Sequence, residues 1–287
     1  MDLVYAWIAS LASATEPLIV KASSKSIIRN PWLFNVLWVA FGIPLVAVFA
    51  LLRGAGFPSN WTIVLLLALS HAGFYVFYTI SLYKIDVSTM SPLFSLRTVF
   101  ALILGVWLLH EKLSGLDVIL VTIIILASPL AAYDERMKLK AFFQKPVFLA
   151  ILGMLFLAFT GYFTNLSSKI NGYATTLLWL DIFVLVLLLP TLKFAELEKN
   201  HLTTKKLFPF VLLGLAGFAY TASATKAYSQ NLSLSSVIVS LPLSMILVIL
   251  FSRKYGHLLE THSYKVYAVR LTAAFIMVGA AILLSWV

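Results

Sequence analysis

The sequence has 287 residues, of which 61% are hydrophobic and 11% are charged. A soluble domain is roughly half apolar and a quarter charged, so the composition excludes a soluble protein and indicates an integral membrane protein. The net charge of +10 does not indicate a nucleic-acid partner, because the basic residues lie in short connections between apolar segments, where they act as topology signals. The chain has no cysteine, which excludes disulfides, thiolate sites and iron–sulfur clusters, and we expect no cofactor and no metal.

Ten apolar segments of about 20 residues follow one another along the chain, and each is long enough to cross a bilayer as a helix. They span residues 3–23, 32–52, 61–83, 87–109, 115–132, 146–168, 174–192, 207–228, 233–252 and 266–286. The connections are short and contain turn residues or charges. The sequence therefore predicts an all-α integral membrane protein with ten transmembrane helices.

The two halves of the chain resemble each other in sequence. Residues 21–25 (KASSK) resemble residues 165–169 (NLSSK), which lie 144 positions later. Residues 72–74 and 216–218 share the letters AGF at the same offset of 144. Because each half has an odd number of spans, the two halves must cross the membrane in opposite directions.

These observations predict two inverted five-helix repeats, residues 1–144 and residues 145–287, that form one membrane domain. Duplication can be purely structural. In membrane bundles, however, inverted repeats are typical of transporters, which bind their substrate near the bilayer midplane between the repeats.

Further features resemble a known superfamily. Ser91-Pro92 lies early in the fourth span, and Glu111 and Glu260 follow the fourth and ninth spans. With the five-plus-five arrangement, this pattern resembles the drug/metabolite transporter superfamily, and within it the EamA-type ten-helix exporters. The resemblance implies that spans five and ten are peripheral and that the others surround a central cavity. It also implies secondary transport by alternating access, often export of amino acids or related metabolites.

The orientation in the membrane has two opposing indications. Sixteen of the 21 lysine and arginine residues lie at the odd-numbered connections and four lie on the other side. The positive-inside rule then places both termini outside the cytoplasm. The family resemblance implies the reverse, and the residues favour the charge rule. We expect the protein in a prokaryotic cytoplasmic membrane.

Four ionisable residues lie deep inside predicted spans: Glu16, His71, Arg97 and Asp181. Charges at this depth are costly, so they face the bundle interior or a wet cavity and are candidates for function. Arg97 could form a structural ion pair with Glu16 or Asp181. It could equally be the counter-ion of a substrate carboxylate, because a guanidinium binds a carboxylate through two hydrogen bonds.

Two acids against one arginine leave one acid without a cation. Such an acid could carry a proton for a proton-coupled exporter, or it could be permanently neutral and hydrogen-bonded. Protons are therefore a candidate coupling ion.

Aromatic residues in the spans form a second group of candidates, which either pack helices together or line a cavity that binds an amine through cation–π contacts. With His71, the predicted substrate-binding aromatic residues are Tyr75, Tyr78, Trp38, Trp179 and Tyr220. Prolines inside spans bend helices, either as passive shape or as hinges for alternating access. Pro17, Pro92 and Pro242 are the predicted hinges.

The sequence thus predicts a secondary transporter, an exporter of a small polar metabolite such as an amino acid or related amine. Alternatives are a carrier of the sugar-phosphate or nucleotide-sugar type and a polytopic membrane enzyme. An enzyme is disfavoured because the sequence contains no recognisable catalytic motif. The expected partners are a small-molecule substrate, the lipid bilayer and protons, with no nucleic acid. We expect a monomer or a weak homo-oligomer.

Overall fold

The structure is a computed structural model of the whole chain. It describes residues 3–26, 28, 30–85, 87–131, 145–195, 204–244, 246–247 and 263–286. Side chains are not described at positions 25, 26, 87–89, 91, 92, 95, 128, 129, 131, 204, 205 and 285. Glu260 and residues 248–252 of the predicted ninth span lie outside the described part of the chain.

Every regular element in the described residues is a helix, as the apolar segments predict. The helices are α1 (Val4–Ser26), α2 (Pro31–Leu52), α3 (Trp61–Leu82), α4 (Val87–Leu108), α5 (Gly115–Ala131), α6 (Lys145–Asn171), α7 (Tyr173–Leu188) with the 3-10 helix η2 (Leu189–Phe194), α8 (Thr204–Gln230), α9 (Leu232–Val239) and α11 (Tyr264–Trp286). Asparagine side chains begin three of them. Asn30, Asn60 and Asn231 accept hydrogen bonds from the first free N–H groups of α2, α3 and α9.

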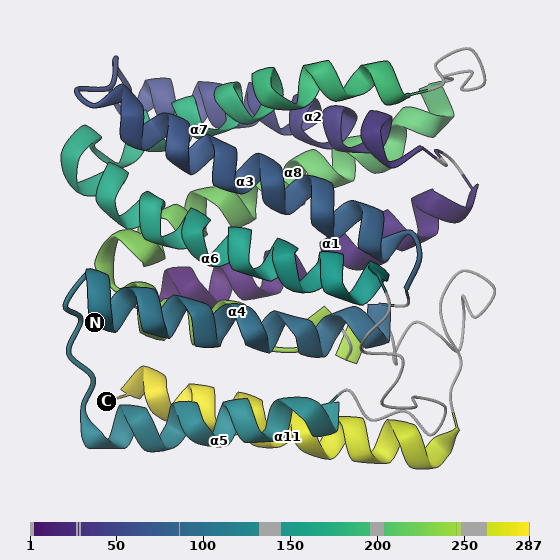
Figure 1. The fold of residues 1–287 in the computed structure, drawn as a ribbon, viewed down its shortest axis with the longest axis vertical. Coiled ribbons are helices and arrows are strands. Elements are labelled where there is room, and N and C mark those ends of the chain that lie inside the picture. The colour runs from purple at the N-terminus through teal and green to yellow at the C-terminus, as the bar shows by residue number, and fades with distance from the viewer. Residues whose placement is uncertain are drawn as a thin grey trace.

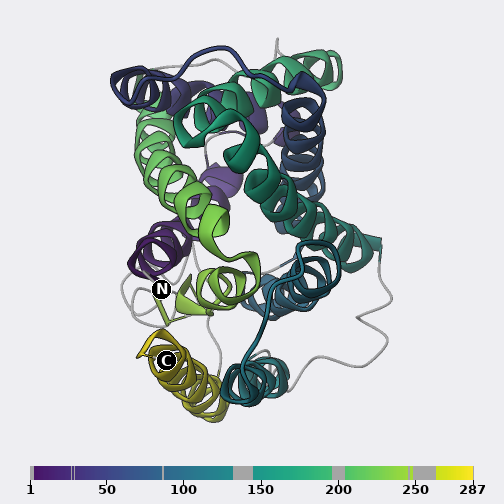
Figure 2. The same ribbon diagram turned by 90° about the vertical axis from the view of Figure 1, so that its left-hand side faces the viewer.

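The helices run roughly side by side, and both termini lie at the same end of the bundle (Figure 1). α1 packs against α8, and α3 packs against α6. α5 and α11 pack mainly on each other and form a separate layer at the edge of the bundle (Figure 2). Spans five and ten are therefore peripheral, as the family resemblance implies.

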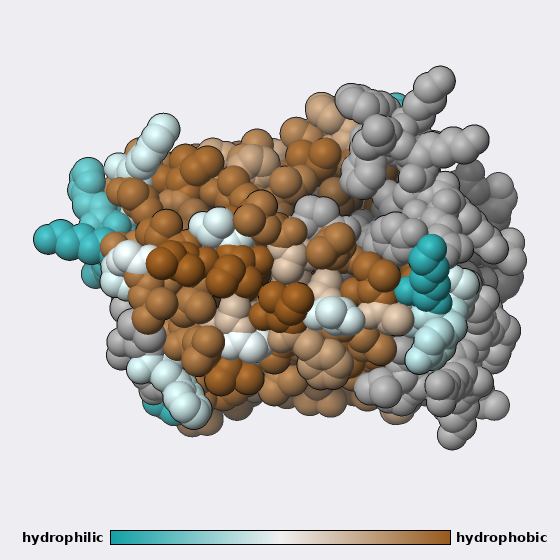
Figure 3. Space-filling model, turned by 90° about the horizontal axis from the view of Figure 1, so that it is seen from below, coloured by the Kyte–Doolittle hydropathy of each residue, from teal (hydrophilic) through white to brown (hydrophobic). Residues whose placement is uncertain are grey.

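The outer face of the α5–α11 layer is apolar. Figure 3 shows a broad hydrophobic band with hydrophilic residues near its ends. Ile119, Leu126, Phe275 and Leu283 are among its exposed side chains.

In the described residues, six helices are long and apolar enough to cross a membrane, namely Pro31–Leu52, Trp61–Leu82, Lys145–Asn171, Tyr173–Phe194, Lys206–Gln230 and Tyr264–Leu284. A belt of this kind matches the hydrocarbon layer of a bilayer.

The predicted ninth span is not one continuous helix. α9 has only eight residues and ends at Val239, and its C-cap Ser240 leaves helical geometry. The Ser240 hydroxyl donates to backbone carbonyls of the last turn, those of Ser236 and Val237, at 2.7 and 3.1 Å. Pro242 has no N–H for the ladder, so the break falls at residues 240–242, which the hydrophobicity of the segment did not reveal.

A carboxylate from the first half holds the start of α9. Glu111 accepts hydrogen bonds from the backbone N–H groups of Leu232 and Ser233, at 2.5 and 2.8 Å, and from the Ser233 hydroxyl at 2.5 Å. The Glu111 carboxylate therefore caps the N-terminus of α9. Gly105 makes it possible, because a side chain there would collide with both Glu111 and Ser233.

Candidate functional site

A cavity lies at the centre of the bundle, where five helices meet the break after α9. It is lined by Ser13, Ala14, Glu16, Pro17, Phe74, Tyr78, Phe94, Arg97, Leu157, Tyr220, Val239, Ser240, Leu241 and Ser244. The volume of the cavity is about 30 Å³, which is enough for only a few water molecules. The structure therefore shows this cavity in a narrow form.

Arg97 lies on α4, and its side chain is only 2% exposed. Its guanidinium carbon is 5.3 Å from the ring centroid of Tyr228, and the guanidinium interacts with the hydroxyl of Tyr220. The Nε and Nη2 atoms of Arg97 are buried without a hydrogen-bond partner. In the described part of the chain, no carboxylate forms an ion pair with this cation, so Arg97 has donors available for a ligand.

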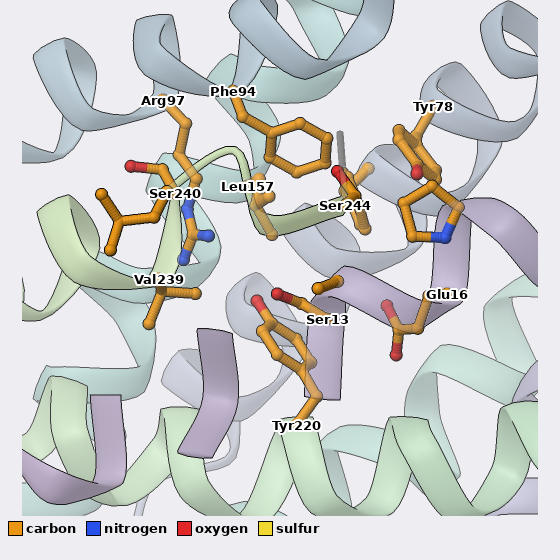
Figure 4. A pocket seen from close by; sticks show the side chains of 14 residues that line it. Ser13, Glu16, Tyr78, Phe94, Arg97, Leu157, Tyr220, Val239, Ser240 and Ser244 are labelled. Carbon is orange, nitrogen blue, oxygen red and sulfur yellow. The ribbon is translucent and has the colours of Figure 1, made fainter. Parts of the chain in front are cut away.

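Glu16 lies on α1 at the other side of the cavity. Figure 4 shows Arg97 and Glu16 on opposite sides, with Ser13 and Tyr220 between them. Tyr78 and Tyr220 are within electrostatic reach of the Glu16 carboxylate. The cavity thus presents a cation, a carboxylate and hydroxyl groups to the same space.

A second, smaller cavity contains the other buried acid. Its lining includes Asp181 of α7, Trp38 of α2, Tyr75 of α3 and Gly217 of α8. The rings of Trp38 and Tyr75 meet edge to face, with centroids 5.0 Å apart. The indole N–H of Trp38 is buried and has no hydrogen-bond partner. This cavity therefore combines a carboxylate, two aromatic rings and an available donor.

A third cavity surrounds His71. It is lined by threonines from α6 and α8 together with Tyr220 and Tyr228. The imidazole stacks on the ring of Tyr75 with centroids 4.9 Å apart, and its Nδ1 is buried without a hydrogen-bond partner. Tyr220 is shared with the central cavity and Thr221 with the Asp181 cavity, so α8 passes all three.

Trp179 lies elsewhere, although, like Trp38, it follows a leucine inside an apolar segment. Its indole N–H donates to the backbone carbonyl of Gly56 at 2.8 Å, and its ring packs against Phe57, Trp61 and Phe183. It does not line any of the three cavities. The two tryptophans therefore differ in what they face.

The predicted hinges occupy different settings. Pro17 lies within α1 and lines the central cavity. Pro242 is the last residue of the break after α9. Pro92 lies in α4, but its side chain is outside the described part of the structure.

Sequence reasoning missed several residues that contribute to the cavities. Tyr228, Ser240 and Ser244 are uncharged, so the search for charges inside spans overlooked them. The Thr98 hydroxyl hydrogen-bonds that of Ser240 where α4 crosses the chain after α9. A search for hydroxyl groups beside a proline in a span would have found Ser240 and Ser244.

Comparison with models of known protein families gives one match. Residues 2–132 match the model of the EamA-like transporter family. This part of the chain is similar to the EamA-like transporter family. This confirms the family predicted from the sequence, and a membrane transporter role fits the apolar helices of the chain.

A solved structure described as "Crystal structure of protein" resembles this chain over almost its full length. The TM-score is 0.77 at 14% identity, with 97% of this chain and 96% of that chain covered. At this identity the likeness concerns the fold alone. No curated protein sequence matches the chain.

Proposed function

We propose that this EamA-like protein is a secondary transporter that exports an amino acid or a related amine by alternating access. The observation that carries the proposal is the placement of Arg97 and Glu16 on opposite sides of one cavity. Arg97 has no carboxylate partner in the described residues, and two of its nitrogens lack any partner. A buried cation in this state favours an anionic ligand, because an unpaired charge in a low-dielectric interior is costly.

The substrate carboxylate binds to the guanidinium of Arg97 through two hydrogen bonds. An amino group of the substrate lies toward Glu16. The hydroxyl groups of Tyr78, Tyr220 and Ser240 are near enough to contact its polar atoms. The proposed setting is a prokaryotic cytoplasmic membrane, where such an exporter acts.

Two five-helix repeats, residues 1–144 and 145–287, form the moving parts. In an inverted repeat, α1 corresponds to α6 and α3 corresponds to α8. The contact between α1 and α8 then has the contact between α6 and α3 as its counterpart, and both contacts are present. The Lys21 ammonium donates hydrogen bonds to the backbone carbonyls of Leu82, the last residue of α3, and of Ile85, just after it. Asn165, 144 positions after Lys21, donates to the Tyr228 carbonyl near the end of α8. These paired contacts support an inverted repeat.

The break after α9 supports alternating access. Discontinuous helices near the midplane are common at transporter substrate sites. Ser240 and Leu241 of the break line the central cavity, and the cavity is too small for a metabolite. Movement of the chain around Pro242 would open it.

Protons are the proposed coupling ion. Glu16 and Asp181 line separate cavities, and the described residues offer no ion pair to either acid. A carboxylate in this setting can take up and release a proton as the cavity opens to alternate sides.

The test is counterflow in proteoliposomes that contain the purified protein. A carrier accelerates the entry of labelled amino acid when unlabelled amino acid is inside, whereas an enzyme or a scaffold does not. We expect accelerated exchange for the wild-type protein and none for Arg97→Ala. Exchange that is unaffected by Arg97→Ala would contradict the proposed site.

A carrier of phosphorylated sugars is less well supported. Phosphate groups call for several basic side chains. Among the residues that line the three cavities, Arg97 is the only lysine or arginine.

A further inference from the structure

Asp181 has no role in the binding of a simple zwitterion, yet its cavity adjoins the one that contains Glu16. Gly217 separates the two acids. A methyl group on Gly217 would lie 3.8 Å from Oε1 of Glu16 and 3.7 Å from Nε1 of Trp38. Trp38 and Gly217 in turn line the cavity of Asp181. The two carboxylates are thus on either side of one small gap in the bundle.

The Asp181 cavity has the features of a binding site and not only of packed core. Trp38 lines this cavity, its side chain is 2% exposed, and its indole N–H has no acceptor, so a bound group or a water molecule could accept this hydrogen bond. The rings of Trp38 and Tyr75 also face this space, and aromatic rings attract cations. Tyr75 is within electrostatic reach of both Glu16 and Asp181.

The charges that line the three cavities do not balance when both acids have released their protons. Ionised Glu16 and Asp181 give two negative charges, against one positive charge on Arg97. A zwitterion is neutral and leaves the imbalance in place. A ligand with one carboxylate and two positive groups would neutralise the site, which matters because charge is costly in a low-dielectric interior.

We propose that the substrate is an amino acid with a second positive charge, a diamino acid. Its carboxylate binds Arg97, and its two ammonium groups lie at Glu16 and at Asp181, the latter between Trp38 and Tyr75. This inference rests on the proposed function, because it uses the same Arg97–Glu16 cavity. It adds a second cation site, which determines specificity.

The test compares lysine with norleucine, which has a side chain of similar shape but no second charge. Binding of each to the purified full-length protein in detergent is measured by calorimetry. We expect lysine to bind at least about tenfold more tightly than norleucine, since a paired charge is readily worth 1.4 kcal/mol or more. Asp181→Asn should bring the ratio of the two affinities close to one, and Asp181→Glu, which keeps the charge, should retain most of the preference.

Gly217→Ala supplies a second variant that does not alter charge. The added methyl group fits at ordinary contact distance but narrows the gap between the two cavities. We expect Gly217→Ala to weaken the binding of lysine more than the binding of norleucine. Gly279→Ala is the matched control, because no atom lies within 4 Å of the added methyl group.

The outcomes separate the two proposals. Equal binding of lysine and norleucine would overturn the second cation site and leave amino-acid transport intact. A preference for lysine that survives Asp181→Asn would also overturn it. If neither compound binds and counterflow is absent for amino acids in general, the proposed function itself fails.

Discussion

The guanidinium of Arg97 faces the ring of Tyr228 at 5.3 Å, and this contact joins α4 of the first half to α8 of the second. The cation is stabilised by a π-system and a tyrosine hydroxyl and not by an acid. In the proposed mode of binding, a substrate carboxylate would therefore not have to displace a protein carboxylate. The sequence had left open whether Arg97 pairs with Glu16 or Asp181, and in the described residues neither pair forms.

We predict that Arg97→Lys weakens substrate binding at least about tenfold, because an ammonium cannot present the two parallel donors of a guanidinium. Tyr228→Phe retains the ring and should have much less effect. Calorimetry of substrate binding to the wild-type protein and to the two variants measures both effects. Equal losses for the two variants would contradict the assigned roles.

Gly105→Ala should destabilise the fold through the Glu111 cap of α9. The added methyl group collides with Glu111 and Ser233, so the carboxylate must leave at least one N–H of α9 unpaired. We expect a loss of about 1–3 kcal/mol in the free energy of unfolding. Thermal unfolding in detergent measures the change, and Gly279→Ala, a helical glycine with open space around it, serves as the control.

Gly214→Ala should be more damaging than Gly217→Ala on the same helix. A methyl group at Gly214 would lie 2.6 Å from the backbone oxygen of Phe41, so α2 and α8 would have to separate. Overpacking of this kind typically costs about 1–3 kcal/mol. The same thermal unfolding assay compares the two variants, and equal stability would show that the close approach of α2 and α8 is not required.

Pro242→Ala should restore part of the helix after α9, because alanine supplies the missing N–H. We expect slower counterflow with little change in substrate affinity, since Pro242 does not line the cavities that hold the charged groups. Affinity and exchange rate are measured separately. Unchanged counterflow would argue that the break is passive shape.

Glu16→Gln and Asp181→Asn each remove a group that can exchange a proton. If protons drive export, each variant should alter the pH dependence of counterflow, measured with equal pH on both sides of the vesicle across a series of buffers. Wild-type pH profiles in both variants would exclude these acids as proton carriers.

The helix boundaries show how well the local sequence predicts where helices begin and end. The apolar segment predicted at 61–83 is α3, Trp61–Leu82, because Asn60 caps its start and its length suits a bilayer. The helix predicted at 233–252 is interrupted after Ser240, because Pro242 supplies no N–H and the Ser240 hydroxyl donates to carbonyls of the last turn of α9. Apolarity alone does not record such a break.

The sequence by itself determined the class of protein, the helical segments and the charged residues at depth, because bilayer thickness and the cost of buried charge act on local composition. Only the tertiary structure decided what those residues face. Trp38 lines a cavity and Trp179 joins a separate aromatic cluster, although their sequence surroundings are alike. Arg97 meets Tyr228, which lies more than one hundred residues away in the chain. Such contacts depend on how helices from the two halves cross, and that packing is a property of the whole bundle.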